Sequence, residues 1–108
     1  MVHRYWQHRV KEMFESAGWD AFLETFDADV YVHLDSFELA VEIAMGDNPR
    51  EIKHVEKHMD KGFVVWILCR NEEIRNGLRQ RLQEQDSLKK SVSFRLLRQV
   101  NEIELPFG

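Results

Sequence analysis

Apolar and polar residues alternate along this chain in several distinct patterns, and each pattern predicts one element of secondary structure. Between residues 4 and 17 the apolar side chains recur at helical spacing, and Gly18 is expected to end that helix. The alternation that follows predicts strands, and in the first of them Phe22 is expected to face the core, with Ala21 or Leu23 as further candidates. The three predicted strands are residues 20–26, 29–34 and 37–45.

The second half of the chain predicts two helices and two further strands. Pro49 suits the first turn of a helix that Gly62 ends, and Asn71 is expected to cap the next helix. Between these helices the apolar run 63–69 has the length of a strand buried on both faces. Residues 91–97 alternate as a last strand. The order αβββαβαβ predicts an α/β fold of three layers around a mixed central sheet.

The second and third predicted strands form a hairpin whose register follows from its apolar face. Asp35 and Ser36 suit a two-residue turn between them. One face then pairs only apolar residues, namely Leu34 with Phe37, Val32 with Leu39 and Val30 with Val41. The other face places Asp29 opposite Glu42, with Asp27 nearby. Like charges opposite each other on neighbouring strands are destabilising, so the pair raises the question of a role.

Two interpretations of the paired carboxylates follow from their surroundings. A solvated polar face is the ordinary explanation for acids on an amphipathic hairpin. However, small Ala40 and Ala44 flank Glu42, and the strand at 63–69 requires helices on both sides of the sheet. The acidic face is therefore expected to be partly covered, and covered carboxylates need a cation, a proton or a hydrogen-bond donor. Mg²⁺ commonly binds one or two carboxylates together with waters.

Composition narrows the class of protein. The 108 residues fit one domain, residues 1–108, with a hydrophobic fraction of 44% and a charged fraction of 31%. No apolar run approaches the roughly 20 residues that span a bilayer, so no membrane association is expected. The single cysteine excludes an internal disulfide and fits a cytoplasmic location. A net charge of −4 argues against coating nucleic acid by bulk charge, although a local basic surface remains compatible with it.

The order of elements and the acidic pair resemble the PD-(D/E)xK nuclease superfamily, which has the restriction-endonuclease-like fold and includes archaeal Holliday-junction resolvases. The resemblance covers roughly residues 4–70 and rests on "ADV" with Asp29, on "VEIA" with Glu42 and on the 13 residues between the two acids. It implies that both side chains are catalytic and hold Mg²⁺ or Mn²⁺ for hydrolysis of a DNA phosphodiester. The chain is also similar to variants of this domain attached to archaeal DNA-translocating ATPases, which carry a similar "yWq" helix and "VEIA"-like strand, and this implies fusion to an ATPase. A homodimer is the expectation if the domain is an interaction module.

The same resemblance assigns roles to the first helix. Many members of the superfamily carry a polar or acidic residue in this helix, and Gln7 is the nearest match. Arg4, His8 and Lys11 give the helix a basic polar side, which would stand near the acidic pair and contact DNA phosphates. Solvated charge is the ordinary explanation for these residues, as it is for a second basic region, comprising Arg75, Arg79, Arg81, Lys89, Lys90, Arg95 and Arg98.

The sequence departs from the family pattern at the motif lysine. This lysine should follow the glutamate by two residues, and that position is Ala44. Some relatives move the lysine to the following helix, which makes Lys53 and Lys57 the candidates; Lys53 lies closer to the apolar stripe and is the preferred catalytic replacement. The departure indicates lost or altered catalysis. The alternative function is a non-catalytic DNA-binding or protein-interaction module of a larger DNA-handling protein.

The histidine pair of the second predicted helix and the single cysteine are two further candidates for functional residues. His54 and His58 lie one helical turn apart, a spacing that can chelate zinc, but the sequence offers no third ligand. A pair of surface histidines is the preferred interpretation. Cys69 ends an apolar strand and is interpreted as a small buried hydrophobic residue.

Overall fold

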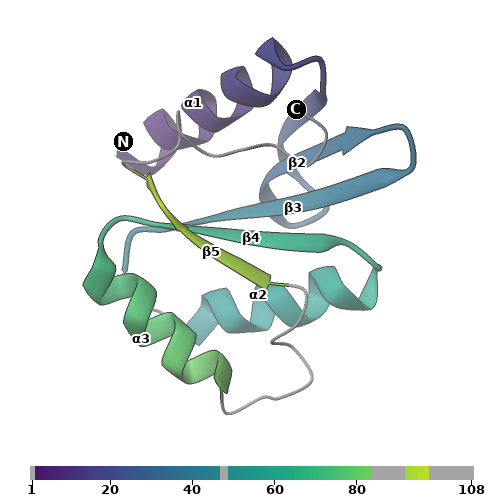
Figure 1. Cartoon of the computed structure of the whole chain (residues 1–108). Helices are drawn as coiled ribbons and strands as arrows, with labels where there is room; N and C mark the ends of the chain where they lie inside the picture. Colours follow the sequence, from purple (N-terminus) through teal and green to yellow (C-terminus); the bar gives the residue numbers. More distant parts are fainter. Residues whose placement is uncertain (1, 47–48, 84–91, 98–108) are drawn as a thin grey trace.

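The computed structural model describes residues 2–46, 49–83 and 92–97, and in these ranges it confirms the predicted order of helices and strands. Figure 1 shows their arrangement. The elements are α1 (Val2–Ser16), β1 (Asp20–Thr25), β2 (Ala28–Leu34), β3 (Phe37–Ala44), α2 (Pro49–Asp60), β4 (Val64–Cys69), α3 (Glu72–Gln83) and β5 (Val92–Leu96). The described part of the chain is therefore a mixed α/β fold with three helices and a five-stranded sheet.

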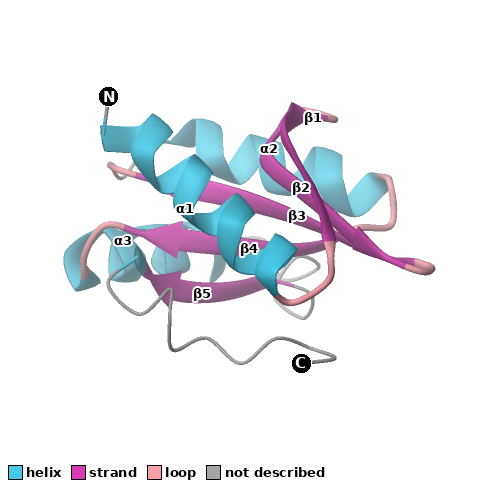
Figure 2. Ribbon diagram, turned by 90° about the horizontal axis from the view of Figure 1, so that it is seen from above, coloured by secondary structure: helices cyan, strands magenta, loops and turns pink. Residues whose placement is uncertain are grey.

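The sheet has the strand order β1-β2-β3-β4-β5. The two pairs among β1, β2 and β3 are antiparallel, while β3 with β4 and β4 with β5 are parallel. Tight turns suffice for antiparallel neighbours, whereas parallel neighbours need a longer crossover, and α2 fills that role between β3 and β4. Seen from above in Figure 2, β1 and β5 form the two edges of the sheet.

The hairpin register is confirmed pair by pair. Leu34 lies opposite Phe37, Val32 opposite Leu39 and Val30 opposite Val41, as the apolar pattern predicted. Asp35, in the turn, has a φ of 54°, a left-handed conformation that aspartate tolerates better than most residues. The regular pairing of β2 with β3 ends at Val30 and Val41, just before the acidic pair.

The helices cover the sheet from both sides, with α1 on one face and α2 and α3 on the other (Figure 1). On the α1 side, Val10 and Phe14 pack in one cluster with Trp66 and Leu68 of β4. On the other side, residues of α2 and α3 pack with the remaining members of β4, in a cluster that includes Val55, Leu78, Val65, Ile67 and Cys69. The prediction that β4 is buried on both faces is confirmed, as is the burial of Cys69.

The prediction for Phe22 is wrong. Its side chain is 46% exposed, while its neighbour Ala21 is 5% exposed and belongs to the α1-side cluster. The reason is that α1 covers the Ala21 face of β1, whereas α2 packs farther along the sheet, against β3 and β4. Phe22 therefore lies on a face of the edge strand that the described helices leave open.

No helix in the described ranges is both long and apolar enough to cross a membrane.

Candidate site at the open end of the β2–β3 hairpin

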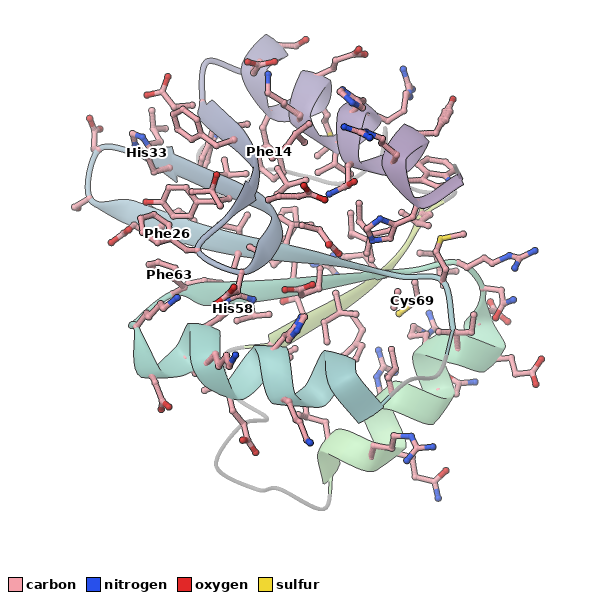
Figure 3. The ribbon with its side chains drawn as sticks, turned by 180° about the vertical axis from the view of Figure 1, so that it is seen from behind. Phe14, Phe26, His33, His58, Phe63 and Cys69 are labelled. Carbon is pink, nitrogen blue, oxygen red and sulfur yellow. The ribbon has the colours of Figure 1, made fainter. Side chains whose placement is uncertain are left out.

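Glu42 lies on β3 between the buried Ala40 and Ala44 and faces α2, and it is itself only 1% exposed. Its Oε1 atom lies 2.6 Å from Nε2 of His58 and 3.6 Å from Nδ1 of His54. The small neighbours leave room for these two imidazoles, which come from successive turns of α2. Figure 3 labels His58, which lies between the sheet and α2.

The interpretation of His54 and His58 as a surface pair is wrong for His58, which has no exposed surface. Burial lowers the pKa of His58 from 6.5 to about 4; the charges of His54 and Lys61 act in the same direction, and Asp27 and Asp29 oppose them. The imidazole is therefore neutral near pH 7, and a proton on Nε2 lets it donate to Glu42.

This arrangement leaves two ring nitrogens without hydrogen bonds. Nδ1 of His58 and Nδ1 of His54 are buried, and neither has a hydrogen-bond partner in the part of the chain that the structure describes. Polar atoms in this condition are uncommon in folded proteins, and each weakens the folded state unless something else satisfies it. The hydrogen bond to Glu42 is thus the main polar contact that holds His58 in place.

Asp29, at the start of β2, is held from the other side of the sheet. Its Oδ2 atom accepts the backbone N–H of Ile43 at 2.7 Å and lies 3.2 Å from Nε2 of His3. Gln7 is also buried, and its Nε2 donates to the backbone oxygen of Asp29 at 3.1 Å. The Asp29 carboxylate thus accepts a backbone N–H of β3 beyond the last regular pair of β2 and β3. Its contact with His3 connects α1 to the hairpin.

The two acids therefore lie in one region but contact different helices. Asp29 contacts α1 through His3, whereas Glu42 contacts α2 through His54 and His58. The charge of Asp29 nevertheless acts on His58, where it opposes the lowering of the pKa.

One oxygen of each carboxylate already has a partner. Oδ2 of Asp29 already accepts a hydrogen bond from the backbone, and Oε1 of Glu42 is occupied by His58. Across the described ranges, no group of three or more His, Cys, Asp or Glu side chains is positioned to hold a metal ion. Weak binding of Mg²⁺ or Mn²⁺ stays a prediction.

Lys53, the expected replacement for the motif lysine, is exposed on α2, and so is Lys57. Within the described residues, no hydrogen bond or ion pair joins Lys53 to Asp29 or Glu42. The motif position itself, Ala44, has no exposed surface and packs in the cluster that contains Val55 of α2. The helix therefore fills the space beside Glu42 where a motif lysine would stand.

The three residues assigned to DNA contact lie on α1. Arg4 and His8 are exposed, and Lys11 is half-buried with its Nζ 2.8 Å from Glu15. These three residues fall on one face of the helix, next to the turn that carries His3 to Asp29. Of the second basic region, Lys89, Lys90 and Arg98 lie outside the described residues.

His58 is the site residue whose role sequence reasoning missed. The available signal was its position between Val55 and Met59 on the apolar stripe of the helix, together with small residues on β3 that leave room for a ring.

Comparison of the chain with protein-family models, with curated proteins and with solved structures finds no match.

Proposed function

We propose that this chain is a nuclease-like domain of the restriction-endonuclease type that has lost catalysis and binds DNA. The order of helices and strands, the mixed sheet and the acidic pair at the open end of the hairpin support this assignment. The placement of Gln7 beside Asp29 supports it as well, because a polar residue in the first helix belongs to the pattern of that superfamily.

The contact between Glu42 and His58 is the main argument for the loss of catalysis. A hydrolytic site must expose its carboxylates to a metal ion and to the phosphate that the metal polarises. Glu42 is instead buried under α2 and bonded to a neutral imidazole, and the motif position Ala44 is filled by packing. An imidazole held against the glutamate by burial cannot also carry the positive charge that a lysine would bring to a phosphate.

The basic side of α1 is the surface that we assign to DNA. Arg4, His8 and Lys11 fall on one face of the helix, and Arg4 and His8 are exposed to solvent. The β1–β3 region offers no alternative, because the chain has no lysine or arginine between residues 12 and 49. Phosphate contacts need cationic or N–H donor groups, so a duplex is expected to approach α1 and to avoid the hairpins.

Binding of a fluorescently labelled four-way junction and of a linear duplex tests this surface. At about 50 mM salt, we expect Arg4→Glu to weaken binding roughly tenfold and to reduce the dependence of affinity on salt concentration. The matched control is Arg79→Glu, which changes the net charge equally but lies on α3, where Arg79 stands over the ring of Phe94. Equal losses in both variants, or no binding by the intact domain, would contradict the assignment to α1.

A cleavage assay tests the loss of catalysis. We expect supercoiled, linear and four-way-junction DNA to remain intact with Mn²⁺, because Glu42 is covered by His58. Asp29→Ala and Glu42→Ala are run beside the intact domain. Cleavage that disappears in both variants would make the pair catalytic and overturn the proposal, whereas cleavage that survives both would come from a contaminant or from a different site.

A further inference from the structure

Aromatic side chains form a continuous patch on the open face of the β1–β2 hairpin. The patch consists of Phe22, Phe26, Tyr31 and Phe63, and we call it the aromatic patch. The ring of Tyr31 lies 6.3 Å from Phe22, 4.9 Å from Phe26 and 5.5 Å from Phe63, between ring centroids. In Figure 3, Phe26 and Phe63 lie along one side of the molecule, between His33 and the buried His58.

Two rings of the aromatic patch are open to solvent. Phe22 is 46% exposed and Phe26 is 52% exposed, while Tyr31 and Phe63 beneath them are 7% exposed. Tyr31 donates its hydroxyl to Glu38 at 2.6 Å, and burial together with this carboxylate raises the pKa of Tyr31 to about 12. The patch thus has a fixed base and two exposed rings, beside the edge strand β1.

Acidic side chains flank Phe22 on its face of the sheet, while Lys61 stands over Phe26. Residues 20–42 contain no lysine or arginine and the following seven carboxylates: Asp20, Glu24, Asp27, Asp29, Asp35, Glu38 and Glu42. Of these, Glu42 is buried against α2 and Asp29 contacts His3 of α1, so neither belongs to the surroundings of the patch. Asp20 and Glu38 lie on the same face as Phe22, since both are cross-strand neighbours of His33, and both are exposed. Such a rim repels phosphates and attracts cationic groups.

One cation already occupies the aromatic patch. Nζ of Lys61 stands 5.6 Å from the ring centroid of Phe26 and donates to the backbone oxygen of the same residue at 3.3 Å. A cation over an aromatic face is attracted by the negative π surface of the ring. Lys61 therefore shows, within this chain, how an ammonium group is held at Phe26, in the turn after β1. Phe22, on β1 itself, has no lysine or arginine over its ring among the described residues.

We propose that the aromatic patch, with the carboxylates around it, binds a partner polypeptide segment in which arginine or lysine alternates with apolar residues. The apolar side chains cover Phe22 and Phe26, and the cationic side chains lie over the ring of Phe22 and beside Asp20 and Glu38. This surface is separate from the basic side of α1, so the inference goes beyond DNA binding and does not depend on it.

The test uses a labelled octapeptide that alternates arginine and leucine, and a counterpart that alternates glutamate and leucine. We expect only the arginine peptide to bind, and a double variant with Phe22→Ser and Phe26→Ser to weaken it at least about tenfold, since exposed aromatic residues dominate such contacts. The double variant keeps the net charge, so a loss cannot come from bulk attraction. Tyr5→Ser, at an equally exposed aromatic residue on α1, is the matched control and should change affinity less than about twofold.

Asp20→Lys provides a second measurement that does not depend on the aromatic rings. Its side chain is 72% exposed, so the substitution should leave folding intact while weakening the arginine peptide. Equal binding of both peptides, unchanged affinity in the double variant and in Asp20→Lys, or an equal loss in Tyr5→Ser would overturn the proposal. Binding of a single-stranded oligonucleotide that is lost with Phe22 and Phe26 would also overturn it, because the patch would then stack bases.

Discussion

Replacing His58 with alanine is expected to lower the free energy of unfolding by about 3–5 kcal/mol, which is the usual effect of leaving a buried charge without its partner. The substitution leaves the carboxylate of Glu42 at 1% exposure without its closest donor, 2.6 Å away. It also opens a cavity under α2, where His58 has no exposed surface. Urea denaturation followed by circular dichroism measures the loss.

Two variants separate the hydrogen bond from the packing of the ring. His58→Gln keeps a side-chain N–H donor and is expected to lose less than His58→Ala, because Glu42 retains a partner. His8→Ala, at an exposed histidine of α1, is the matched control and should change the free energy of unfolding by less than about 0.5 kcal/mol. A loss in His58→Ala no larger than that of His8→Ala would show that Glu42 is satisfied without α2.

The second large effect is a loss of stability as the pH is lowered, and it also comes from His58. In the folded state its pKa is lowered from 6.5 to about 4, whereas in the unfolded chain the ring has its ordinary value. Between these two values the unfolded state binds a proton that the folded state does not. The contribution to stability is therefore complete above pH 6.5 and is lost as the pH falls toward 4. At about 1.4 kcal/mol per unit, the full window amounts to about 3 kcal/mol.

The comparison of wild type with His58→Gln isolates this contribution from the other titrating groups. The groups that act on His58 are His54, Lys61, Asp27 and Asp29, together with Glu42 in direct contact, and all of them remain in the variant. Between about pH 7 and about pH 5, we expect the wild type to lose about 2 kcal/mol more than the variant. Equal losses of stability in the two proteins would contradict the lowered pKa of His58 in the folded state.

The local pattern of the chain was sufficient to predict most of the fold. Alternation with a period of two assigned the strands, and matching the apolar face of the hairpin set its register, because a slip of one residue would turn that face to solvent. The same reasoning selected Asp29 and Glu42 as an unusual pair, and the family resemblance selected Gln7, which the structure places against the backbone of Asp29. These features depend on neighbours in sequence or on one hairpin.

Contacts between distant elements decided the rest. Phe22 faces outward because α1 covers the opposite side of β1 and α2 packs mainly against β3 and β4, and neither fact is encoded in the alternation of residues 20–26. His58 is buried because its partner Glu42, 16 residues earlier on another element, is brought beneath it by the packing of α2 on β3. The sequence of α2 alone does not show whether solvent or a carboxylate faces His58. Only the tertiary structure shows that this residue covers Glu42.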